Sequence, residues 1–190
     1  MDHLINICLA IGLSAACGFR VFIPLLVMSV ASLSGHMTLS QGFQWIGSYP
    51  AFIVFATAAI FEIVAYYFPW LDNMMDTISG PVAVIAGMFV AASGMIDMDP
   101  LLKWSLAIIA GGGAAGIFHG LTAIVRGTST ALSGGVGNPV VATIEWAIAV
   151  ILSILAIALP FVGIIFILAV LFWSAKKIIQ KVTHPKRQQG

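Results

Sequence analysis

Residues 140–159 read VVATIEWAIAVILSILAIAL, twenty residues in which Glu145 is the only charged side chain. A helix of about 20 mostly apolar residues is long enough to cross the hydrocarbon core of a bilayer. The stretch therefore predicts a transmembrane helix. By the same criterion, breaking residues divide the rest of the chain into five more apolar segments, at 4–33, 51–68, 81–96, 106–125 and 161–175.

The composition agrees with a chain that lies almost entirely in a membrane. Hydrophobic residues make up 61% of the 190 residues and charged residues only 8%, against roughly 25% charged in an ordinary soluble domain. So few charges cannot cover a water-facing surface, and the lipid bilayer is the predicted partner. We predict an all-α fold, a single polytopic transmembrane helical bundle over residues 1–190 with about six spans, five and seven being the alternatives.

The basic residues predict how the bundle is oriented. Five of the eight Lys and Arg residues lie in the tail 176–190, and basic residues near span ends favour the cytoplasmic side. The C-terminus is therefore predicted in the cytoplasm, and an even number of spans places the N-terminus there too. Arg126 then agrees with the rule, whereas Lys103 falls outside and conflicts with it. Because the basic residues cluster only in this tail, nucleic acid is not a predicted partner.

An internal repeat is suggested by sliding the chain against itself by 99 residues. This offset places Arg20 over His119 and superposes Gly12, Ala15, Ala16, Leu33, Ser34 and Gly35 on Gly111, Ala114, Ala115, Leu132, Ser133 and Gly134. Units 4–97 and 103–176 would each hold three spans and insert with opposite orientation, as in many transporters, whose sites lie at interrupted helices. The segments 12–24 and 111–120 would be those interruptions. Part of the match is expected from the abundance of Gly and Ala alone.

Four ionisable residues within the apolar segments are the candidate pathway residues: Arg20, Glu62, His119 and Glu145. A charge at the membrane centre costs on the order of 2.5 to 3.5 kcal/mol even on the mild insertion scales, so such residues need partners or a wet cavity. One interpretation is a path for an ion, a proton or an anionic substrate. The other is a buried ion pair that only fixes how the helices pack.

Asp72 and Asp76 are four residues apart after Pro69, and so share one face of a predicted helix. Two carboxylates there suit a hydrated divalent cation or a cationic partner group at the cytoplasmic mouth of a pathway. The alternative is a solvated turn, because acids are favoured near a helix start. The metal is left unassigned.

The stretch 127–139 is rich in Gly, Ser and Thr and ends in Asn138 and Pro139, directly before the segment that carries Glu145. Its backbone amides suit an anion, but it lacks the Lys of a nucleotide-binding loop, and a flexible loop or re-entrant segment is the alternative. No ordered Ser, His and Asp set, zinc-type His spacing or redox cysteine pair is present. The sequence therefore favours a protein that is not an enzyme, and no cofactor is predicted.

Several motifs occur together: Gly18-Phe19-Arg20-Val21-Phe22-Ile23-Pro24-Leu25, then Glu62 with Pro69-Trp70-Leu71-Asp72 and Asp76, then Gly137-Asn138-Pro139-Val140-Val141 with Glu145. Together they resemble the uncharacterised bacterial membrane family called domain of unknown function 4126, over residues 10–175. The resemblance implies a small polytopic protein of a bacterial cytoplasmic (inner) membrane and supplies no activity. The family often has a charged pair and a further acid where this chain has Tyr66, Tyr67 and Trp146, so roles of those charges do not carry over.

The leading functional prediction is a small transporter or channel-like protein that moves an ion or a small anionic substrate, lipids included, through a polar site at the interface of the two units. The alternative is a membrane assembly or interaction subunit that transports nothing, with its charges paired internally or with a partner helix. Small residues four apart, Gly12 with Ala16 and Gly112 with Gly116, permit a homodimer.

Overall fold

The computed structural model describes residues 2–162, 164–165, 168–169, 172 and 176. Within this part the side chains of Asp2, Pro69, Trp70, Asp72, Asn73 and Asp76 are not described. The described chain is helical and contains no strand, as predicted. Its elements are α1 (Asp2–Cys17), α2 (Phe22–Leu33), η1 (Gln44–Gly47), α3 (Tyr49–Ala65), α4 (Pro69–Gly94), α5 (Pro100–Leu106), η2 (Ala107–Gly112), α6 (Gly113–Ser133) and α7 (Asn138–Ala158).

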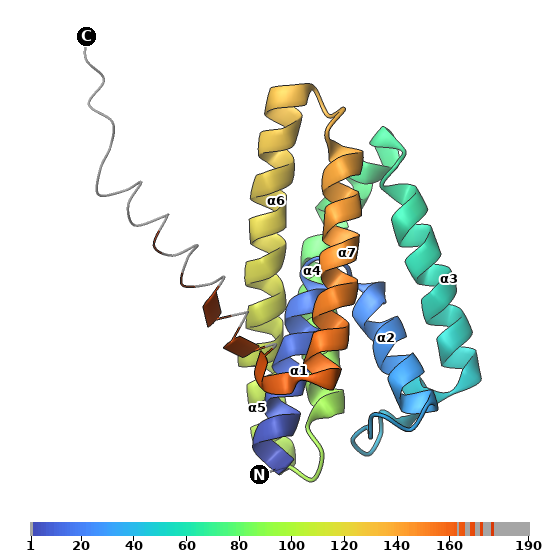
Figure 1. Cartoon of the computed structure of the whole chain (residues 1–190), viewed down its shortest axis with the longest axis vertical. Coiled ribbons are helices and arrows are strands. Elements are labelled where there is room, and N and C mark those ends of the chain that lie inside the picture. Colours follow the sequence, from blue (N-terminus) through green and yellow to red (C-terminus); the bar gives the residue numbers. More distant parts are fainter. Residues whose placement is uncertain (1, 163, 166–167, 170–171, 173–175, 177–190) are drawn as a thin grey trace.

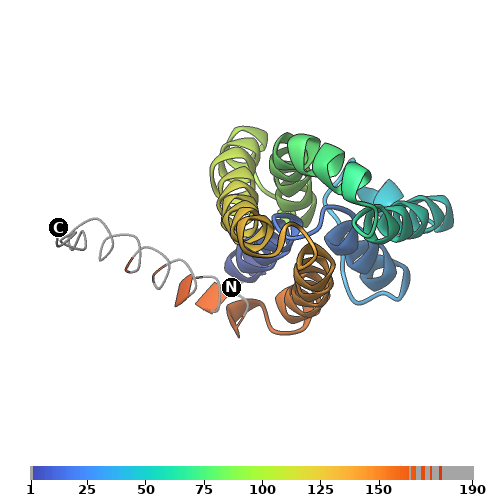
Figure 2. The ribbon, with the colours of Figure 1, turned by 90° about the horizontal axis from the view of Figure 1, so that it is seen from above.

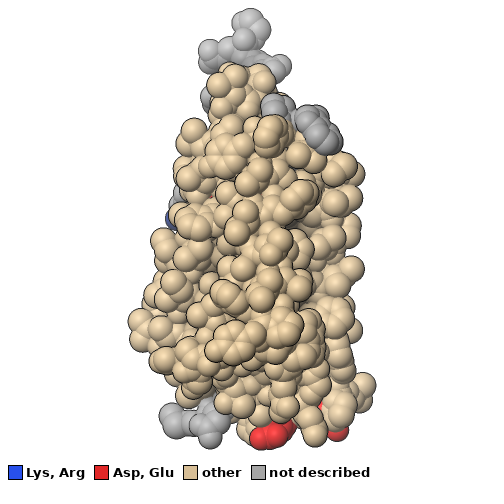
Figure 3. All heavy atoms as spheres, turned by 90° about the vertical axis from the view of Figure 1, so that its right-hand side faces the viewer, with Lys and Arg blue, Asp and Glu red and all other residues tan. Residues whose placement is uncertain are grey.

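Three helical stretches are long and apolar enough to cross a membrane: Thr77–Gly94, Pro100–Ser133 and Asn138–Ala158. Large apolar side chains such as Ile60 and Ile151 are exposed on the outside of the bundle. On the face formed by α3 and its neighbours, the acidic side chains that the structure describes appear at one end (Figure 3). The protein is therefore a membrane protein. The count of six spans is not confirmed, because segment 4–33 folds back on itself, as described below, and most of the segment 161–175 lies outside the described residues.

The first apolar segment, 4–33, is not one continuous helix. It forms α1 and α2, which are joined by residues 18–21. The two helices are about 24 Å and about 18 Å long at 1.5 Å per residue, both shorter than a hydrocarbon core of about 30 Å. Figure 1 shows α1 rising to the middle of the bundle and α2 descending from there to the same end. The pair is therefore a re-entrant helical hairpin, and the expectation that this segment crosses the membrane once is wrong.

The non-helical link of the hairpin keeps its backbone N–H groups bonded. Those of Gly18, Phe19 and Arg20 donate to the carbonyl oxygens of Ala15 and Ala16. A backbone break inside a membrane protein is tolerated where its polar groups are satisfied by the protein itself. The link also lies tightly against α6, since a Cβ on Gly18 would come within 2.5 Å of the Ala115 carbonyl oxygen.

The helices of the central layer pack closely through small residues. A Cβ on Gly87 of α4 would lie 2.6 Å from the Cβ of Ala115 on α6, and one on Gly12 would lie 2.8 Å from the Cβ of Ala156 on α7. A Cβ on Gly112 would lie 2.8 Å from Cγ of Met88, also on α4. The small-residue pairs that were expected to permit a dimer are thus used within the chain. A homodimer stays a prediction without that support.

The second segment of the suggested repeat has a different local structure from the first. Residues 111–120 are not interrupted: they continue from the π-helical turn η2 into α6. Arg20 therefore lies in the non-helical link between α1 and α2, whereas His119 lies inside a helix. The repeat gains no support from these two segments.

The loop within the Gly- and hydroxyl-rich stretch 127–139 is shorter than expected. Helix α6 continues to Ser133, and only residues 134–137 form the turn before α7. Gly134 and Gly135 have φ of 62° and 91°, a left-handed conformation that favours Gly. The backbone N–H of Gly137 donates to the Ser133 hydroxyl, so the turn is a tight connection between α6 and α7.

The hairpin predicts which positions of the chain react with a membrane-impermeant reagent from the same side of the membrane. His3, His36 and Val136 are exposed; the first two lie at one end of the bundle and the turn that holds Val136 lies at the other (Figure 1). In a variant with Cys8 and Cys17 replaced by Ala, we expect His3→Cys and His36→Cys to react with an impermeant maleimide from the same side. Val136→Cys should react only from the other side, and permeabilised membranes should label all three. Labelling of residues 3 and 36 from opposite sides would contradict the hairpin.

The close packing of α4 on α6 predicts an asymmetry between two glycines. We expect Gly87→Ala to lower the free energy of unfolding by about 1–3 kcal/mol, because the added methyl group overpacks the interface. Gly120→Ala on α6 is the control: nothing lies within 4 Å of its Cβ position, and Ala favours a helix by up to about 1 kcal/mol over Gly. Heat unfolding in detergent, followed by circular dichroism, measures both. Equal stability of the two variants would contradict the packing.

Candidate functional site

Four charged residues from four elements meet inside the bundle. Arg20 lies in the link of the hairpin, Glu62 on α3, Arg126 on α6 and Glu145 on α7. Their exposed fractions are 2%, 3%, 5% and 4% in that order. Three of the four predicted pathway residues, Arg20, Glu62 and Glu145, are therefore brought together. We call these four residues the charged cluster.

Glu145 is the centre of the ion pairing. Its Oε2 lies 3.0 Å from Nη2 of Arg20. Nε of Arg126 donates to Oε1 at 3.0 Å and to Oε2 at 3.1 Å, and Nη2 of Arg126 is paired with Oε2 as well. Two cations on one carboxylate, all buried, form a strong charge-assisted network in a medium of low dielectric constant. This network joins the hairpin to α6 and α7.

Tyr66, at the end of α3, supplies a surface for both guanidinium groups. Cζ of Arg20 lies 3.7 Å and Cζ of Arg126 4.2 Å from the centroid of the Tyr66 ring. A guanidinium over an aromatic face is attracted by the ring quadrupole, and this attraction strengthens when both groups are removed from water. The phenol ring therefore favours two neighbouring cations without using their N–H groups.

Arg20 uses only part of its hydrogen-bonding capacity. Its Nη2 donates to Glu145 and, at 3.1 Å, to the carbonyl oxygen of Ala142. Nε and Nη1 are buried and find no acceptor among the described residues. Arg20 also lines a cavity of about 250 Å³ between α3 and α7, together with Ile63, Tyr67, Ala142, Thr143 and Trp146. The hydroxyl groups of Tyr67 and Thr143 line this cavity and are hydrogen-bonded to each other at 3.0 Å.

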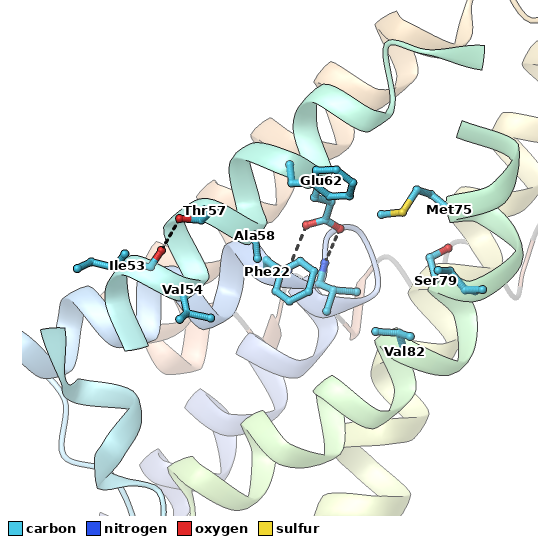
Figure 4. A pocket seen from close by; sticks show the side chains of 12 residues that line it. Phe22, Ile53, Val54, Thr57, Ala58, Glu62, Met75, Ser79 and Val82 are labelled. Carbon is cyan, nitrogen blue, oxygen red and sulfur yellow. Dashed lines mark hydrogen bonds between the residues drawn. The ribbon is translucent and has the colours of Figure 1, made fainter. Parts of the chain in front are cut away.

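Glu62 is not ion-paired with Arg20 but binds the start of α2. Its two oxygens accept the backbone N–H groups of Val21 at 3.0 Å and Phe22 at 3.1 Å. The first N–H groups of a helix have no partner within the helix and favour a negative charge. Glu62 therefore accepts the two backbone N–H groups that the end of α1 leaves without an acceptor. It attaches the tip of the hairpin to α3 (Figure 4).

The other predicted site residues lie apart from the charged cluster. His119 is half-buried, its ring lies against Gly80 of α4, and among the described residues it makes no hydrogen bond to Arg20, Glu62 or Glu145. Asn138 begins α7, where Pro139 is a suitable early residue, and exchanges hydrogen bonds with the Thr130 hydroxyl. Its role is to join the ends of α6 and α7.

Asp72 and Asp76 lie in the first two turns of α4, as their spacing suggested. Their side chains are outside the described part of the structure, so the predicted cation site is not tested. The start of α4 and the N-terminus of the chain lie at opposite ends of the bundle (Figure 1). Among the residues whose side chains are described, no three His, Cys, Asp or Glu residues form a metal-binding group.

The sequence did not predict the roles of Arg126 and Tyr66. Arg126 was placed just beyond a span ending at residue 125, whereas α6 continues to Ser133 and keeps it inside the bundle. Ala131 and Leu132 are the strong helix formers among residues 128–133, and the Gly and hydroxyl content of the stretch concealed this signal. Tyr66 carried no signal, because a Tyr near a span end is also typical of an interface anchor.

The comparisons with known proteins identify a family but no activity. A family model described as domain of unknown function (DUF4126) matches residues 7–179, nearly the whole chain. No curated protein and no solved structure matches the chain.

The pairing around Glu145 predicts a large effect of its removal. We expect Glu145→Gln to lower the free energy of unfolding by about 3–5 kcal/mol, because two buried guanidinium groups lose their shared carboxylate. Asp99→Asn is the control: Asp99 is exposed and caps α5, and Asn caps a helix equally well, so a change within about 0.5 kcal/mol is expected. Denaturation in mixed detergent micelles measures both variants. A Glu145→Gln variant as stable as the control would show that this network contributes little.

Proposed function

We propose that this chain, which belongs to the family of domain of unknown function 4126, is a small transporter or channel-like protein. It moves an ion or a small anionic substrate, lipids included, past the charged cluster. The observation that carries the proposal is the state of Arg20. Its guanidinium group is buried in the link between α1 and α2, and two of its nitrogens lack an acceptor among the described residues. A cavity lies beside it.

The energetics favour a ligand at Arg20 over a purely structural role. Leaving a buried donor without an acceptor costs about 1–3 kcal/mol, and more for a charged group. A cluster selected only for stability would place acceptors on those nitrogens, as it does on Nη2. An anionic oxygen from a substrate supplies the missing acceptor, and the hydroxyls of Tyr67 and Thr143 line the same cavity.

The hairpin is the element that we propose to move. Its helices end in mid-bundle, and transporters place such interrupted helix ends at their substrate sites. The tip is attached on one side by Glu62, through Val21 and Phe22, and on the other by Glu145, through Arg20. A substrate anion on Nε and Nη1 of Arg20 shares the guanidinium charge with Glu145 and so weakens one of the two attachments. The inverted-repeat relation is not needed for this mechanism.

For the orientation, we propose a bacterial cytoplasmic membrane with the N-terminus in the cytoplasm. Helix α5, which carries Lys103, lies at the same end of the bundle as the N-terminus (Figure 1), so this placement brings Lys103 to the cytoplasmic side, where basic residues are favoured. The start of α4 then faces outward, and Asp72 and Asp76 mark an outer rather than a cytoplasmic mouth.

An assembly subunit is the second candidate, and one observation favours it. Glu145 binds Arg20 and Arg126 together in a buried network, and such pairs also serve to specify how helices pack. In this case the unbonded nitrogens of Arg20 would receive an acceptor from a partner protein.

A flux measurement separates the two candidates. In proteoliposomes of the full-length chain we expect uptake of at least one anionic probe among chloride, phosphate, acetate and a fluorescent phosphatidylglycerol. Arg20→Gln should reduce it by at least about tenfold, because a buried charge-assisted hydrogen bond contributes about 1.5–3 kcal/mol. Lys103→Gln, which removes one positive charge away from the cluster, should leave it unchanged. Uptake that survives Arg20→Gln contradicts the site; no uptake together with one stoichiometric co-purifying membrane protein favours the assembly subunit.

A further inference from the structure

A second hollow lies on the other side of α3 from the Arg20 cavity. It is a groove of about 670 Å³ between α2, α3 and α4. Ile53, Val54 and Phe61 of α3 form one wall, and Ile78 and Val82 of α4 form the other (Figure 4). Seen from above, α3 lies at the outer edge of the bundle next to α2 (Figure 2). The groove exists because α3 packs mainly on α2 and η1 and scarcely touches α4.

The groove has the dimensions and lining of a site for a hydrocarbon chain. Its lining runs along α3 from Ile53 to Glu62, a length of about 13 Å at 1.5 Å per residue. The rim residues Ile53, Phe61 and Ile78 are large, apolar and more than half or about half exposed, as side chains that face lipid are. In a bilayer, apolar chains rather than water therefore have access to the groove.

One end of the groove carries one charged side chain among the lining residues that the structure describes. Glu62 lines it there, and Figure 4 shows its carboxylate pointing from α3 toward the start of α2. Each oxygen accepts one backbone N–H, and a carboxylate oxygen has room for a second hydrogen bond. Glu62 thus suits a group that donates a hydrogen bond. A second carboxylate or a phosphate would meet a like charge, which costs several kcal/mol at an interface.

We propose that this groove binds one hydrocarbon chain of an uncharged or cationic amphiphile, whose terminal hydroxyl or ammonium group donates a hydrogen bond to Glu62. The site takes the opposite head-group charge to the Arg20 cavity and does not depend on transport. The two hollows differ because Glu62 of α3 lines one of them and Arg20 lines the other.

Photo-crosslinking of the full-length protein in nanodiscs tests the occupant. The probe is a sixteen-carbon alcohol with a diazirine on its chain, and mass spectrometry locates the adducts. We expect adducts within residues 53–62 and 75–82. Unlabelled hexadecanol and hexadecylamine should compete, and palmitate should compete at least about tenfold less well, because at 4 Å two like charges repel by far more than the 1.4 kcal/mol that a tenfold difference requires.

Three variants on α3 make the result specific. Ala58→Trp fills the groove and should abolish the adducts, whereas Ile60→Trp, on an exposed position outside the groove lining, should leave them unchanged. Glu62→Gln keeps an acceptor but removes the charge, so palmitate should then compete as well as hexadecanol. Adducts spread evenly over the outer surface, or unaffected by Ala58→Trp, overturn the site. Equal competition by acid and alcohol in the unmodified protein overturns the role of Glu62.

Discussion

The burial of one guanidinium, that of Arg20, is the constraint on which the rest of the arrangement depends. A charge in the middle of a lipid-surrounded bundle must find its partners within the protein. Glu145 and the Ala142 carbonyl come from α7 and the Tyr66 ring from α3. Arg126 joins through the same carboxylate and the same ring. These contacts join the helices that carry the groups to the link in which Arg20 lies.

Arg20 lies in a non-helical link, and the backbone polar groups of that link must also be hydrogen-bonded. Non-helical backbone inside a membrane is stable only when its polar groups are bonded by the protein. The carbonyl groups at the end of α1 accept three N–H groups of the link, and Glu62 accepts the next two. A single carboxylate on α3 thus completes the hairpin. The two glutamates have separate tasks: Glu145 pairs with a side chain, and Glu62 with a helix start.

Helix α3 separates two hollows with different chemistry. Arg20 lines the smaller one, beside two hydroxyl groups, and Glu62 lines the larger one, beside apolar side chains. Because α3 packs mainly on the hairpin, a shift of the hairpin tip would alter both hollows together.

The sequence by itself determined the helical membrane class, the family, and three of the buried charges, because the lengths of apolar segments and the cost of a charge in lipid are local properties of the chain. It also predicted an interruption within residues 12–24. Only the tertiary structure decided that this interruption reverses the chain, that Arg126 belongs to the cluster and that His119 does not. It also decided that Gly12 and Gly112 pack inside the chain. These features depend on which helices become neighbours, and neighbours far apart along the chain leave no pattern in the spacing of residues.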